Sequence, residues 1–130
     1  MSISQPTPER KAPLKLPTRP EEDEQRAVAQ YLDMRRDLVW CHVGNGGMRN
    51  RAEGGKLKAQ GVKAGVPDIL IFNATKEGHV GTAIELKRRD GGKLTIGQIE
   101  WLCNLKKNRW ATALCHGSDE AIEVLKRLYG

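Results

Sequence analysis

The chain has 130 residues, of which 38% are hydrophobic and 29% charged, a composition typical of one globular domain. No window approaches the ~18 consecutive apolar residues of a membrane-spanning helix, and the first residues lack the apolar stretch of a signal peptide. The net charge of +6 favours phosphate-bearing partners, although many basic proteins bind no nucleic acid. Three widely spaced cysteines fit reduced thiols in the cytoplasm better than a disulfide framework.

Residues 1–20 form the first region, and they hold five of the six prolines. Because residues before proline avoid the helical conformation, we expect a flexible, basic tail. Such a tail either adds nonspecific affinity for phosphate or is simply a solvated leader. A single folded domain is then expected over residues 21–130.

The hydrophobic pattern of this domain alternates between helices and strands. A helix is expected from Glu21, directly after a proline, with an apolar stripe at Val28, Tyr31 and Leu32. Ser118 is expected to cap the last helix. Between them we expect a strand at 38–43, a loop that becomes helical near 55–60, a hairpin of strands 67–72 and 79–87, a helix at 95–107 and a strand at 110–115. This order predicts an α/β fold with a central mixed sheet flanked by helices.

The predicted hairpin brings two carboxylates together. Its turn is centred near Lys76 and Glu77, so residues whose numbers sum to about 153 should lie opposite each other. Asp68 and Glu85 meet this condition, with Cβ atoms ~5 Å apart on one face of the sheet. Two such carboxylates repel each other unless a cation lies between them.

The chemistry of this pair favours a hard, oxygen-seeking cation such as Mg²⁺ or Mn²⁺. Lys87 lies two residues after Glu85 and therefore faces the same side of the strand. A divalent ion would polarise a scissile phosphate, and an ammonium group would steady the developing negative charge. The pattern thus predicts hydrolysis of phosphodiesters.

The segments GVPDILIF and AIELKRRDGGKLTIGQIEWL resemble the PD-(D/E)xK nuclease superfamily, and within it the VRR-NUC family. The helix EDEQRAVAQYL and the loop GNGGMRN match stand-alone bacterial and phage members, so the resemblance covers about residues 21–128. The resemblance implies a restriction-endonuclease-like core fold. It also implies a protein that acts in the cytoplasm of a bacterial or phage-infected cell. Since such members are similar to Holliday junction resolvases, it also implies a homodimer that cuts branched DNA.

The resemblance also implies roles for individual residues. Asp68 and Glu85 would be metal ligands together with the Leu86 carbonyl, Lys87 the catalytic lysine, and Gln98 a supporting glutamine. The helical glutamate of the family falls on Glu24, with Glu21 as the alternative one helical turn earlier.

Several residues allow more than one interpretation. Gln98 also completes a Thr95-x-x-Gln98 capping box, and both roles can coexist. Two Cys-His pairs, at 41–42 and 115–116, resemble a zinc quartet, but neighbouring residues on a strand point to opposite faces. His42 with Asn45 resembles part of an HNH nuclease motif, but a second suitable His is missing. A glycine-rich cationic segment is either a solvated loop or a phosphate-binding surface; its cations are Arg49, Arg51, Lys56, Lys58 and Lys63.

The leading hypothesis is therefore a Mg²⁺- or Mn²⁺-dependent DNA endonuclease that favours branched substrates such as Holliday junctions. One alternative is a noncatalytic module that binds branched DNA. Another keeps the chemistry but acts as a nickase on linear duplex DNA.

Overall fold

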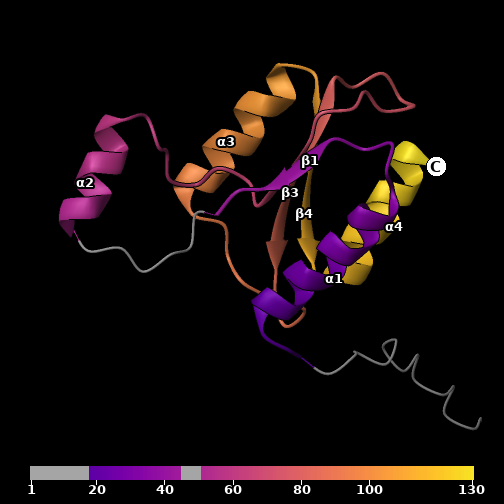
Figure 1. Cartoon of the computed structure of the whole chain (residues 1–130), viewed down its shortest axis with the longest axis horizontal. Coiled ribbons are helices and arrows are strands. Elements are labelled where there is room, and N and C mark those ends of the chain that lie inside the picture. The colour runs from indigo at the N-terminus through magenta and orange to yellow at the C-terminus, as the bar shows by residue number, and fades with distance from the viewer. Residues whose placement is uncertain (1–17, 45–50) are drawn as a thin grey trace, which may run out of the picture.

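The computed structural model of the chain describes residues 18–44 and 51–130 and has the expected α/β architecture (Figure 1). One four-stranded mixed sheet has the order β1-β2-β3-β4, antiparallel except for the parallel pair β3 and β4. The elements are α1 (Glu21–Met34), β1 (Trp40–His42), α2 (Arg51–Ala59), β2 (Ile69–Ile71), β3 (Gly81–Lys87), α3 (Ile96–Lys107), β4 (Trp110–His116) and α4 (Ser118–Tyr129).

Helices cover both faces of this sheet. In Figure 1, α1 and α4 lie side by side on one face and α3 lies on the other. The hydrophobic core lies under α1 and α4, because the strands turn their large aliphatic side chains to that face. Its buried residues include Val28, Leu32, Ile69, Ile71, Ile84, Leu86 and Leu125.

The register of the hairpin leaves the opposite face for polar groups. Ile69 pairs with Ile84 and Ile71 with Thr82, so the predicted sum of 153 is confirmed. Since side chains alternate along a strand, Glu85 and Lys87 face the side that α3 covers. The hairpin thus places the acidic side chains on the face of the sheet opposite the aliphatic core.

Several details differ from the sequence-based expectations; the helix expected near residues 55–60, for example, already begins at Arg51. Ser118 does not cap α4: the N-cap is Gly117, with a φ of 94° that favours glycine, and the Ser118 hydroxyl bonds to Glu24 instead. The expected tail extends to residue 20, but Arg19 belongs to the folded domain because it also bonds to Glu24. The rest of the tail, residues 1–17, lies outside the described residues.

None of the helices in the described part of the chain combines the length and apolar character of a bilayer-spanning segment.

Candidate active site

Asp68 lies directly before β2, at the end of the sheet that β3 reaches with Glu85. Continuing the observed register by one residue places the two side by side. The Leu86 backbone N–H donates to Asp68 Oδ2 at 2.7 Å, which fixes one oxygen of this carboxylate on β3. The structure therefore brings the predicted acidic pair together.

Glu85 is buried, with 2% of its surface exposed, and only half of its carboxyl group is satisfied. Gln98 Nε2 donates to Oε1 at 3.1 Å, whereas Oε2 is buried without a hydrogen-bond donor. Burial, together with the neighbouring charge of Asp68, raises the pKa of Glu85 to about 8. Two carboxylates can bond to each other only through a proton or a shared cation, so this pair needs a positive charge between its oxygens.

Lys87 and Gln98 complete the cluster from β3 and α3. Lys87 Nζ lies 3.7 Å from Glu85 Oε1 and donates to Gln98 Oε1 at 3.3 Å. The same Oε1 accepts the Thr95 N–H at 2.9 Å, and Thr95 Oγ1 accepts the Gln98 N–H at 3.1 Å. Gln98 is thus at once a partner of Glu85 and a member of the capping box that starts α3.

The donor set of this cluster fits a hard divalent cation. Mg²⁺ in proteins commonly takes one or two carboxylates and completes its shell with water and substrate oxygens. Asp68 and Glu85 supply two carboxylates, and the donorless Glu85 Oε2 is an oxygen that such an ion would satisfy. Among the described residues, no ready-made group of three or more acidic, His or Cys side chains is present, so water and substrate would supply the other positions.

Glu24, the residue assigned to the metal from the family resemblance, does not lie in this cluster. Its carboxylate is fully buried and bonds to Arg19 and Arg89, at distances from 2.6 to 3.1 Å, and to the Ser118 hydroxyl at 3.1 Å. Both of its oxygens are therefore occupied by cationic or hydroxyl donors. In this structure the Glu24 carboxylate is therefore the anionic centre of an ion-pair cluster, and its role as a metal ligand stays a prediction from the family resemblance.

The alternative, Glu21, lies one helical turn earlier and faces the acidic pair. Its charge contributes to the raised pKa of Glu85. Glu21 also lines a cleft of about 350 Å³ together with Asp68 and His42, at the open end of the sheet between α1 and β1. The cleft gives a phosphodiester or a hydrated ion access to Asp68.

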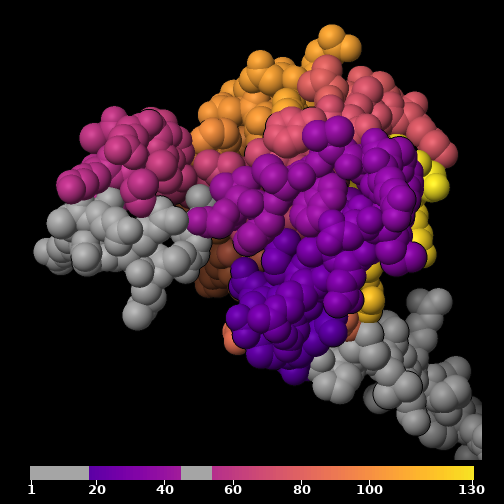
Figure 2. Space-filling model, viewed as in Figure 1, coloured from indigo at the N-terminus to yellow at the C-terminus, as the bar shows by residue number. Residues whose placement is uncertain are grey.

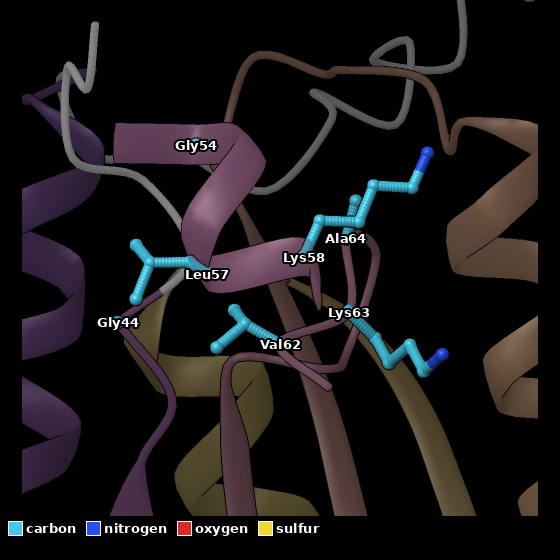
Figure 3. Close-up of a pocket in the computed structure, with 7 residues that line it drawn as sticks. All are labelled: Gly44, Gly54, Leu57, Lys58, Val62, Lys63 and Ala64. Carbon is cyan, nitrogen blue, oxygen red and sulfur yellow. The ribbon is translucent and has the colours of Figure 1, made fainter. Parts of the chain in front are cut away.

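The predicted cationic surface lies on and after α2, which stands to one side of the sheet (Figures 1 and 2). Lys56, Lys58 and Lys63 are exposed, in keeping with a solvated or phosphate-binding surface. In Figure 3, the Lys58 and Lys63 amino groups extend to one side of a cavity of about 340 Å³, whereas Leu57 and Val62 gather near Gly44. The side chain of Arg51 is not described, and Arg49 lies outside the described residues.

The two minor metal hypotheses gain no support. Cys41 and His42 lie on β1, and Cys115 and His116 lie on β4, at opposite edges of the sheet, so they cannot share one zinc ion. The HNH hypothesis also involves Asn45, which lies outside the described residues.

Comparison with known proteins agrees with this fold. The VRR-NUC domain family matches residues 19–119. The chain belongs to the VRR-NUC family, within the PD-(D/E)xK superfamily. A solved structure described as a VRR_NUC domain protein is similar, with a TM-score of 0.71 and 26% identity, over 87% of this chain and 90% of that chain. No significant match was found among proteins with curated descriptions.

Sequence reasoning missed the partners of the buried Glu24. Arg89 lies two residues after Lys87 of the Glu-x-Lys motif, in the run KRRDGG, and this cationic run was the available signal. Sequence reasoning also gave His42 no part in the acidic site, although His42 lines the cleft beside Asp68.

Proposed function

We propose that this VRR-NUC domain is a Mg²⁺- or Mn²⁺-dependent endonuclease that hydrolyses DNA phosphodiesters. One observation carries the proposal: a buried Glu85 oxygen without a donor lies beside a second carboxylate, Asp68, and near an ammonium group. In the structural ion-pair cluster of Glu24, by contrast, both carboxylate oxygens accept hydrogen bonds. Membership of a nuclease family supports the same chemistry.

In this mechanism Asp68 and Glu85 would hold the ion, with the Leu86 carbonyl as the further predicted ligand. When bound, the ion would polarise the scissile phosphate and lower the pKa of the attacking water. Lys87 steadies the negative charge that develops on the phosphate, since its ammonium group is held at the cluster by Gln98. Gln98 in turn orients Glu85 through its Nε2 donor. Glu21 is positioned to contact water at the mouth of the site.

The exposed lysines on and after α2 are the proposed DNA contacts. Phosphate contacts fix the orientation of a duplex without reading its sequence. We therefore expect the three lysines to contribute to DNA affinity and not to sequence specificity. Replacing Lys56, Lys58 and Lys63 with Ser should weaken DNA binding and reduce its salt dependence. Arg49 and Arg51 are proposed members of the same surface from the sequence alone.

The preferred substrate is proposed to be branched DNA, cut by a homodimer with one active site in each protomer. Two symmetry-related cuts on opposite strands need two sites, and the described residues of one chain provide one Asp68–Glu85 pair. Light scattering should then give twice the mass of the chain. A monomer that nicks linear duplex as fast as a four-way junction would support the nickase alternative.

Cleavage assays test the proposal directly. The purified protein is incubated with four-way junction, flap, single-stranded and duplex DNA, with and without Mn²⁺. We expect cleavage of the junction in Mn²⁺, and its loss in Asp68→Asn and Lys87→Ala with junction binding retained. Glu77→Gln, in the exposed hairpin turn, is the matched control. Full cleavage by Asp68→Asn would refute the proposal, and junction binding without any cleavage by the wild type would favour the noncatalytic module.

A further inference from the structure

His42, the last residue of β1, contacts the backbone of the acidic residue that precedes β2. Its ring Nδ1 lies 2.8 Å from the backbone oxygen of Asp68. A carbonyl oxygen can only accept, so Nδ1 carries the hydrogen and donates it. The Val43 N–H donates to the same oxygen at 2.7 Å, continuing the ladder between β1 and β2. Both lone pairs of this carbonyl are therefore engaged.

These contacts hold Asp68 from two separate segments of the chain. Its peptide oxygen is bound by β1, and its Oδ2 accepts the Leu86 N–H on β3. Asp68 lies just outside β2, and the His42 ring adds a second donor to the peptide oxygen that the Val43 N–H already holds, which restrains rotation of this peptide. Small rotations of this peptide would carry the carboxylate away from Glu85.

The surroundings of His42 point to a role in the site rather than in folding. The residue is exposed and takes no part in the hydrophobic core, and substitutions at exposed positions usually change stability by less than about 0.5 kcal/mol. It lines the cleft that also contains Glu21 and Asp68. Its one described hydrogen bond is the one to Asp68.

We propose that His42 is a positioning residue of the nuclease site, which fixes the Asp68 peptide through Nδ1–H so that the Asp68 carboxylate is held in place for the divalent ion. The inference rests on the proposed function. Groups that orient metal ligands typically change metal affinity or activity by about 10- to 100-fold when they are removed. The effect should therefore appear in metal affinity as well as in cleavage.

Two isosteric substitutions separate the two ring nitrogens. The amide nitrogen of Asn reaches the place of Nδ1, and that of Gln reaches the place of Nε2. Mn²⁺ affinity is measured by calorimetry on the full chain without DNA for wild type, His42→Asn, His42→Gln and His42→Ala, with melting temperatures recorded alongside. His79→Asn is the control, because the His79 ring bonds to Thr75 in the hairpin turn, away from the acidic pair.

We expect His42→Asn to bind Mn²⁺ within about 3-fold of wild type, and His42→Gln and His42→Ala to bind at least about 10-fold more weakly, with little change in melting temperature. Junction cleavage at limiting Mn²⁺ should follow the same order. Equal affinities for all variants would overturn the inference, as would retention by His42→Gln with loss in His42→Asn. A wild type that binds no Mn²⁺ would instead overturn the proposed function and this inference with it.

Discussion

Two buried glutamates in this domain have opposite environments. Glu24 is fully buried and Glu85 is 2% exposed, so both have lost almost all contact with water. Burial alone would raise the pKa of Glu24, but hydrogen bonds from Arg89, Arg19 and Ser118 outweigh it and lower that pKa to about 2. Glu85 has burial and the Asp68 charge acting in the same direction, and its pKa rises to about 8.

The difference shows how partners, rather than burial, separate a structural carboxylate from a functional one. The Glu24 cluster is complete, since two guanidinium groups and a hydroxyl neutralise and satisfy the anion. The Glu85 cluster has one oxygen without a donor and a like charge beside it. Such an arrangement is costly on its own, and a cation from outside the chain would relieve it.

The largest expected effect comes from Glu85→Gln, which keeps the shape of the side chain and removes its charge. We expect cleavage in Mn²⁺ to fall on the order of 10³-fold, because an ion ligand worth several kcal/mol is lost. The metal-free protein should melt at the same or a higher temperature at pH 8, since the new amide can donate to Asp68. Parallel cleavage and melting measurements check this, and a strongly destabilised variant would place Glu85 among the structural residues.

Glu24→Gln should have the reverse pattern. Removing one partner of a buried ion pair leaves Arg19 and Arg89 without their anion, and unfolding free energy should fall by about 3 kcal/mol. Mn²⁺ affinity at a temperature well below the melting point should stay within a few-fold of wild type. Urea unfolding and calorimetry measure the two quantities, and a large loss of Mn²⁺ affinity would restore Glu24 to the metal site.

The two glutamates should also produce opposite pH dependences of stability. The lowered pKa of Glu24 means that its stabilising contribution is present above about pH 4.5 and is lost as the pH falls towards 2. The raised pKa of Glu85 means that the metal-free protein loses stability as the pH rises from about 4.5 to 8. Each slope is at most about 1.4 kcal/mol per pH unit. When melting temperature is measured across pH, Glu24→Gln should reduce the loss of stability below pH 4.5, and Glu85→Gln should reduce the loss between pH 4.5 and 8. An unchanged pH dependence in both variants would contradict these environments.

The smallest effects should come from the double role of Gln98. Thr95→Ala removes the cap and should cost about 1 kcal/mol of unfolding free energy with little change in cleavage. Gln98→Ala removes both the cap partner and the donor to Glu85, so in addition to a similar loss of stability it should lower cleavage roughly 10-fold. Equal cleavage by the two variants would reduce Gln98 to a capping residue.

The sequence was sufficient to predict the hairpin and its pairing. Alternating side chains and the turn residues determine which positions share a face, and this is why Asp68 and Glu85 were correctly expected to be neighbours. The capping box could be predicted for the same reason, because it depends only on two residues three positions apart in the sequence.

The fate of the acidic run in α1 could not be predicted in the same way. Glu21 and Glu24 lie on the same side of α1, so the position of the helix along its axis decides which of them reaches the site. That position is set by Arg89, just after β3, and by Ser118 from α4. The contact of His42 with Asp68 likewise depends on the order of β1 and β2 in the sheet. Local pattern contains no information on such distant partners.

The most direct test of the acidic pair is calorimetric titration of the wild-type protein with Mn²⁺ in buffers of different ionisation enthalpy. Because the pKa of Glu85 is about 8 without metal, binding near pH 6.5 should release about one proton per ion, and binding above pH 9 should release almost none. Asp68→Asn should abolish the binding. Absence of binding at millimolar Mn²⁺, or binding without proton release at pH 6.5, would contradict the account.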